Sequence, residues 1–170
     1  MNGQNDQEIT RQRLVELLNE DLSREYQAII AYTIFSQVIK GAQYMTIARE
    51  LEEHAKEELD HARKLAKQLD YFGVRPTSKP QPVPELDSAE DMLRFDLQAE
   101  NETIGHYRTR IRQAEALGEF GLARDLREII RDEQDHQIEL ATALGMDVPK
   151  EGLGDESGYI PGHSPTMSAT

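Results

Sequence analysis

The chain has 170 residues, contains no cysteine or tryptophan, and carries 30% charged residues with a formal net charge of −13. No stretch approaches the roughly 18 uncharged apolar residues of a membrane span, the N-terminus has no apolar signal core, and the absent cysteines exclude thiolate-bound zinc and iron–sulfur sites. The acidity argues against nucleic acid as the main partner and suits a protein that attracts cations, so we expect one soluble, cytoplasmic domain.

Two long amphipathic helices are predicted in the first half of the chain. The first is capped by Asn5 or Asp6 and extends to about residue 40, and Glu25 interrupts its apolar stripe. The second extends over about residues 43–72, and Glu58 interrupts its stripe in the same way. A carboxylate in a protein core costs several kcal/mol unless it is paired or bound to a metal. Both acids are therefore candidates for a functional role.

A proline-rich connection follows the second helix. Residues 73–87, GVRPTSKPQPVPELD, contain four of the seven prolines, which keep the segment out of helical structure. At about 3.3 Å per residue this segment reaches nearly the length of a roughly 30-residue helix. The connection is therefore predicted to cross the whole length of a helical bundle.

Two more helices and a tail complete the predicted fold. Ser88 and Asp91 begin a helix that extends to about residue 117, and a last helix spans about residues 120–144. The fold class is all-α, a four-helix bundle over residues 1–145 with a long crossover between its second and third helices. Residues 146–170 are rich in glycine and proline, so they are interpreted as an irregular tail without a clear fifth helix, or alternatively as a docking peptide.

The two halves of the chain resemble each other at an offset of 75 residues. Glu58 and His61 form a Glu-x-x-His pair, which recurs as Glu133 and His136. Residues three apart share one helix face, so each pair could hold one metal ion. The same offset relates Glu25 to Glu100, Tyr32 to Tyr107, and Asp21 to Asp96.

The predicted hairpins bring the acids and histidines to one height, near the middle of the bundle. Six such ligands can hold two divalent ions, and carboxylate-rich sites with one imidazole per metal suit iron or manganese. The alternative is a metal-free cluster, which would leave four core carboxylates unpaired. The predicted metal ligands are Glu25, Glu58, His61, Glu100, Glu133 and His136.

The segments SREYQAIIAY, EEHAKEELDHA, MLRFDLQAENE and IIRDEQDH resemble the metal-binding segments of bacterioferritins and Dps-like ferritins, over about residues 10–145. The resemblance implies oxidation of Fe(II) by dioxygen or hydrogen peroxide and storage of ferric mineral in a hollow shell of 12 or 24 copies. It also implies that Glu58 and Glu133 bridge the two irons. Glu25 and Glu100 would be terminal ligands, and His61 and His136 would bind one iron each.

Three further positions are compared with this family. Bacterioferritins bind haem with a methionine at the position of Leu59, so the resemblance implies no haem here. Tyr32 could hydrogen-bond a ligand or supply an electron, and is included among the catalytic candidates. Tyr107 is interpreted as a core tyrosine with a satisfied hydroxyl group.

Other polar residues beside the predicted ligands have open roles. Glu57 and Asp132 each precede a bridging acid, and could orient the histidines. Glu53 and Glu57, one turn apart, could instead lead iron towards a cavity. His54 is either a third metal ligand or a solvated side chain.

Two other functions remain open at this stage. One is a di-iron or di-manganese enzyme that consumes peroxide without storage, similar to rubrerythrin or manganese catalase. Against rubrerythrin, the chain has no cysteines, and Thr103 stands where that family has an additional glutamate. The other is an assembly or cargo protein that is addressed by its tail.

Overall fold

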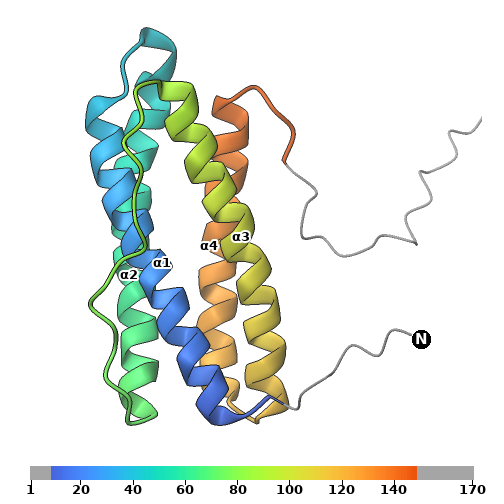
Figure 1. The fold of residues 1–170 in the computed structure, drawn as a ribbon. Helices are drawn as coiled ribbons and strands as arrows, with labels where there is room; N and C mark the ends of the chain where they lie inside the picture. Colours follow the sequence, from blue (N-terminus) through green and yellow to red (C-terminus); the bar gives the residue numbers. More distant parts are fainter. Residues whose placement is uncertain (1–8, 149–170) are drawn as a thin grey trace, which may run out of the picture.

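The computed structural model describes residues 9–148, which form four long helices, one short 3-10 helix and no strand (Figure 1). Consecutive long helices pair as antiparallel hairpins, α1 with α2 and α3 with α4. The predicted all-α four-helix bundle is therefore confirmed. None of the helices in this part of the chain is long and apolar enough to cross a membrane. The elements are α1 (Arg11–Val38), η1 (Ala42–Tyr44), α2 (Met45–Tyr71), α3 (Ala89–Ala116) and α4 (Phe120–Ala143).

The helix starts agree with the sequence in one hairpin and differ in the other. Ser88 caps α3 as predicted, and its Oγ accepts a hydrogen bond from the backbone N–H of Asp91 at 3.0 Å. The cap predicted at Asn5 or Asp6 is wrong, because α1 begins later, with Thr10 as its N-cap. Those two residues lie outside the described part of the chain, as does nearly all of the predicted tail.

The connection between α2 and α3 follows α1 along the bundle, as predicted (Figure 1). The Ser23 hydroxyl donates to the carbonyl of Lys79 at 2.6 Å, and the side-chain amide of Gln27 donates to the carbonyl of Pro82 at 2.5 Å. These bonds satisfy two backbone carbonyls of a segment that forms no helix or strand of its own. The crossover lets α3 begin at the same end of the bundle as α2, so the two helices run in the same direction.

The apolar core is divided into two clusters by a layer of buried polar residues. One cluster contains Leu18, Leu22 and Leu65, and the other contains Phe35 and Leu51. The layer between them contains all six predicted metal ligands, each at most 3% exposed. Charges in this position need compensation, because a buried charge is costly unless it is paired or bound to a metal.

Candidate metal centre

The six predicted ligands form two groups that share two carboxylates. Glu25, Glu58, His61 and Glu133 make one group, and in it one potential ligand atom from each residue lies within 4.8 Å of the others. The second group meets the same limit and also contains Glu58 and Glu133. Two metal positions with two shared carboxylates therefore fit this geometry. The members of the second group are Glu58, Glu100, Glu133 and His136.

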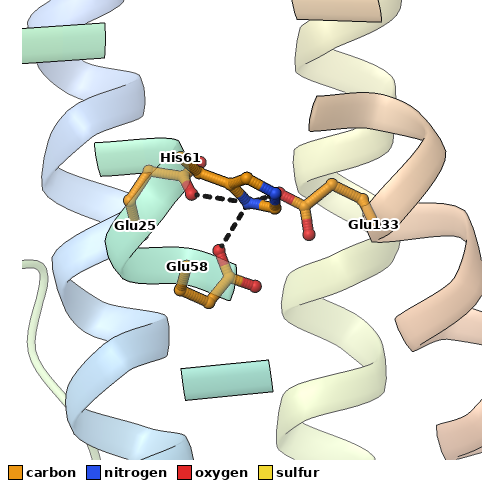
Figure 2. A group of neighbouring side chains, drawn as sticks. All are labelled: Glu25, Glu58, His61 and Glu133. Carbon is orange, nitrogen blue, oxygen red and sulfur yellow. Dashed lines mark hydrogen bonds and ion pairs between the residues drawn. The ribbon is translucent and has the colours of Figure 1, made fainter. Parts of the chain in front are cut away.

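The imidazole of His61 faces the carboxylates of the first group (Figure 2). Its Nδ1 lies 3.1 Å from Glu58 Oε2, 3.4 Å from Glu25 Oε2 and 3.3 Å from Glu133 Oε1. Its Nε2 is turned outwards, 3.3 Å from Asp132 Oδ2. A ring held in this way presents Nδ1 to the point where the carboxylates converge.

His136 repeats this arrangement in the second group. Its Nδ1 lies 3.1 Å from Glu58 Oε1 and 3.3 Å from Glu133 Oε2, and its Nε2 lies 2.7 Å from Glu57 Oε2. Glu57 is on α2 and contacts the histidine of α4, while Asp132 on α4 contacts His61 of α2. Each outer carboxylate therefore fixes a ring on the opposite helix, which is the usual second interaction of a metal-binding histidine.

Both tyrosines of the repeat donate hydrogen bonds to glutamates of the centre. The Tyr32 hydroxyl donates to Glu100 Oε1, and the Tyr107 hydroxyl donates to Glu25 Oε1. Each ring is 1% exposed. Burial and the charge of the adjacent glutamate raise the pKa of both hydroxyls, so they remain protonated donors. Tyr107 is a core residue with a satisfied hydroxyl, but sequence reasoning missed that its partner is Glu25.

His54 is buried at 2% exposure, so its interpretation as a solvated side chain is wrong. Its ring stacks on His136 with centroids 4.0 Å apart, and its Nε2 lies 2.7 Å from Glu139 Oε2. It belongs to neither of the two groups of converging ligand atoms. The signal that could have placed it is its spacing, since seven residues before His61 is two helical turns on the same face. Glu53, by contrast, is exposed and pairs with Lys56.

Apart from the ring nitrogens of His61 and His136 that face them, several oxygens in the centre have no hydrogen-bond donor among the residues of the described bundle. They include Glu25 Oε2, Glu58 Oε1 and both carboxylate oxygens of Glu133. Buried carboxylate oxygens without donors are costly in a metal-free protein. Because these atoms converge with two imidazole nitrogens, the donor set fits two divalent cations.

Without metal, the residues of the centre share protons. Burial, together with the charge of Glu58, raises the pKa of Glu25, and burial together with Glu133 raises the pKa of Glu100. Burial alone would lower the pKa of His61 and His136, but the surrounding carboxylates raise both pKa values well above the usual range. The histidines are therefore protonated at neutral pH in the metal-free state, and a metal ion has to displace those protons.

This proton sharing predicts that the metal-free protein loses stability as the pH rises from about 5.5 to about 8. In this interval histidine of the unfolded chain loses its proton near pH 6.5, whereas His61 and His136 keep theirs. Glu25 and Glu100 act in the same sense, because their raised pKa values make the folded state hold more protons. Burial lowers the pKa of His54 and of His106, so these two groups act in the opposite sense, but only until the unfolded histidines lose their protons near pH 6.5.

The measurement is the melting temperature of chelator-treated protein at the two pH values. The metal-loaded protein is the control and should show the opposite trend, because metal binding releases protons and strengthens as the pH rises. A melting temperature of the metal-free protein that rises with pH would contradict the protonation scheme.

The centre can be approached from two opposite faces. Between α1 and α3, a narrow cavity of about 40 Å³ reaches all four carboxylates of the centre but neither histidine. On the α2/α4 face, one depression reaches His61 beside Asp132, and another reaches His136 beside His54. The carboxylates are thus accessible from one side and the backs of the imidazole rings from the other.

Comparison with known proteins agrees with this geometry. The sequence pattern of the ferritin-like domain matches residues 15–147, which include the whole centre and all of the four helices except the first four residues of α1. The chain belongs to the ferritin-like family. A curated bacterioferritin from Brucella melitensis is 24% identical to this ferritin-like chain over 135 residues, which are 79% of this chain and 84% of the relative.

Two solved structures illustrate the family likeness. A ferritin-like, di-iron-carboxylate protein from Bacillus anthracis is 33% identical, with a TM-score of 0.76 over 80% of this ferritin-like chain and 99% of its own. A dodecameric thioferritin from Bacteroides fragilis, described as bacterioferritin-related, shares the fold at 22% identity and a TM-score of 0.75, over 81% and 88% of the two chains. The converging donors and the di-iron-carboxylate relative together indicate a di-metal site.

Proposed function

We propose that this protein is a ferroxidase that oxidises Fe(II) at an intra-subunit di-iron centre and stores the ferric product in a hollow oligomeric shell. The observation that carries the proposal is the pair of four-residue donor groups sharing Glu58 and Glu133. In this proposal the shared acids bridge the irons, Glu25 and Glu100 are terminal ligands, and each histidine binds one iron. The B. anthracis di-iron relative supports iron as the metal, and manganese is the competing ion.

The side chains of the centre supply charge, orientation and proton exchange for this reaction. Four carboxylates stabilise the higher charge of the ferric state, and Asp132 and Glu57 hold the two imidazole rings in place. As Fe(II) enters, His61 and His136 release the protons that they hold in the metal-free protein. Two Fe(II) substrates lose one electron each. Dioxygen accepts these two electrons together with two protons to give hydrogen peroxide. Alternatively, hydrogen peroxide accepts the two electrons and two protons to give two water molecules.

Anaerobic titration of metal-free protein with Fe(II), followed by an oxygen pulse read by absorbance, tests the proposal. We expect saturation at two irons per chain, a fast oxidation phase, and continued uptake of many irons per chain after repeated pulses. Uptake that stops at two irons per chain would favour a peroxide-consuming enzyme without storage. Tighter binding of Mn(II) than of Fe(II) would favour a di-manganese site. Absence of any binding would overturn the proposal.

The shell part of the proposal rests on the relatives and is tested separately. The B. fragilis relative is dodecameric, and we propose a shell of 12 or 24 copies for this chain as well. Measurement of the particle mass by light scattering distinguishes these assemblies from a dimer, which could not enclose mineral. A preparation without a haem absorbance band would agree with Leu59, which is half-exposed on α2.

We also propose that Tyr32 supplies an electron when only one iron is bound. Reduction of hydrogen peroxide to water needs two electrons, and a single Fe(II) supplies only one of them. Tyr32 can supply the second electron when it also loses its phenolic proton. Glu100, which accepts the hydrogen bond from Tyr32, is positioned to take that proton. Tyr32 lines the cavity between α1 and α3, whereas its repeat partner Tyr107 does not.

Tyr107→Phe is the matched control for Tyr32→Phe, because both changes remove a hydroxyl that donates to a terminal glutamate. With one iron per chain and added hydrogen peroxide, we expect a tyrosyl radical signal in electron paramagnetic resonance for the wild type and Tyr107→Phe. The signal should be lost in Tyr32→Phe. An equal signal in both variants would show that the electron comes from another residue.

A further inference from the structure

A buried carboxylate outside the two donor groups has no partner for one of its oxygens. Asp96 lies on α3, one turn before Glu100, and is 2% exposed. Its Oδ2 has no hydrogen-bond donor within the described residues 9–148. Burial, followed by the charge of Glu58, raises the pKa of Asp96. An acid in such a place is costly, and none of the contacts in the apolar core requires it.

The repeat shows that this lack of a partner is specific to one half of the bundle. The counterpart of Asp96 is Asp21, whose carboxylate receives two hydrogen bonds from Arg110, at 2.7 Å from Nε and 3.2 Å from Nη2. The position that corresponds to Arg110 at the same offset is Phe35, a buried ring that packs against Phe95. One acid is therefore neutralised by a buried cation, while the other is left without one.

Asp96 lines the cavity that leads to the carboxylates of the metal centre. Asp96 is part of the wall of the cavity between α1 and α3, and Asp21 is not. The cavity has exposed Glu102 at its rim and buried Glu58 and Glu133 at its inner end. Its volume of about 40 Å³ exceeds the roughly 15 Å³ that one water molecule requires. A partly hydrated cation can therefore occupy the space next to Asp96.

We propose that Asp96 is a transit ligand, which binds an incoming divalent cation inside the cavity and passes it to the adjacent metal position of Glu58, Glu100 and His136. This inference rests on the proposed di-metal centre and assigns a route to it. Four residues, about 6 Å along the helix axis, separate Asp96 from Glu100, so a cation needs only a short step between them. Because Asp96 Oδ2 accepts no hydrogen bond within the described residues, it can bind the cation without first breaking one.

Loading of metal-free protein with Co(II), without oxygen, tests the transit role separately from catalysis. The absorbance of protein-bound Co(II) gives both the rate of loading in a stopped-flow experiment and the number of ions bound at equilibrium. In Asp96→Asn we expect roughly three- to tenfold slower loading, since one acid of a charged cleft is lost. We expect two ions per chain at equilibrium, as in the wild type.

Glu90→Gln is the matched control, because it removes the same charge from α3 at an exposed position outside the cavity, where Glu90 pairs with Arg94. The control should load at the wild-type rate. A thermal melt of each variant verifies folding, and Asp96→Ser provides a second variant should the amide be tolerated poorly.

Equal loading rates in wild type, Asp96→Asn and Asp96→Ser would overturn the transit role. Loss of one Co(II) ion at equilibrium in either Asp96 variant would also overturn it, because Asp96 would then hold a resident ion. Failure of the wild type to bind two Co(II) ions would instead remove the di-metal centre itself, and the transit role with it. The first two outcomes leave the proposed function standing.

Discussion

Replacement of Glu58 by alanine is expected to abolish the fast phase of Fe(II) oxidation. Glu58 is the α2 member of both donor groups, so its loss removes one ligand from each metal position at once. Loss of a single supporting contact to a metal ligand already lowers affinity or activity by about 10- to 100-fold. We therefore expect the initial rate in Glu58→Ala to fall by at least about 100-fold, measured by stopped-flow absorbance after an oxygen pulse.

Two other substitutions define what this result would mean. Asp60→Ala removes an exposed acid of the same helix and should leave the rate unchanged. Within the described residues, the Asp60 carboxylate forms an ion pair only with Arg63. Glu25→Ala removes a residue of one donor group only, and should reduce binding towards one ion per chain. Two tightly bound ions and a wild-type rate in Glu58→Ala would mean that the donor groups are not the metal site.

Replacement of Arg110 by alanine is expected to cause the largest loss of stability. Arg110 is 4% exposed and Asp21 is 2% exposed, so the substitution removes the close cation of a buried carboxylate and leaves only the longer ion pair with Arg24, at 3.6 Å. Breaking a buried ion pair in this way costs about 3–5 kcal/mol. For a chain of this length that corresponds to a decrease in melting temperature of roughly 10 °C. Urea denaturation of the metal-free protein measures the change in free energy of unfolding.

The matching control removes both charges. Asp21→Leu combined with Arg110→Met replaces the pair by apolar side chains of similar volume, and should recover most of the lost stability. Urea denaturation of the double variant under the same conditions isolates the cost of the unpaired carboxylate. A loss below about 1 kcal/mol in Arg110→Ala would show that Asp21 finds solvent or another donor.

The helices and the convergence of the centre could be predicted because both follow from local spacing. Glu25, Glu58, Glu100 and Glu133 interrupt apolar stripes of period 3.6, and such a residue faces the core whichever partner it meets there. Equal distances from the turns then place the acids at one height. Helix direction and residue spacing alone decide this convergence, and the rotation of each helix about its axis does not enter.

Contacts between helices could not be predicted in the same way. Whether Glu57 reaches His136 or stays with its own helix depends on how far α2 and α4 are rotated about their axes. The burial of His54 follows from its spacing to His61, but its stacking on His136 depends on the same rotation of α2 and α4. The start of α1 was missed because several residues near it can cap a helix, and Thr10 is the one whose side chain accepts the bond.

The long crossover joins two hairpins, neither of which contains a complete set of donors. In the proposed di-metal centre, the first position would take three residues from the α1–α2 hairpin and one from the α3–α4 hairpin, and the second position would reverse this division. Each bound ion is therefore a coordinate cross-link between the two halves of the molecule. Thermodynamic linkage is reciprocal. If docking of the two hairpins raises the affinity for metal by some factor, bound metal raises the equilibrium constant of docking by the same factor. Metal content and tertiary integrity are thus two readouts of one equilibrium in this bundle.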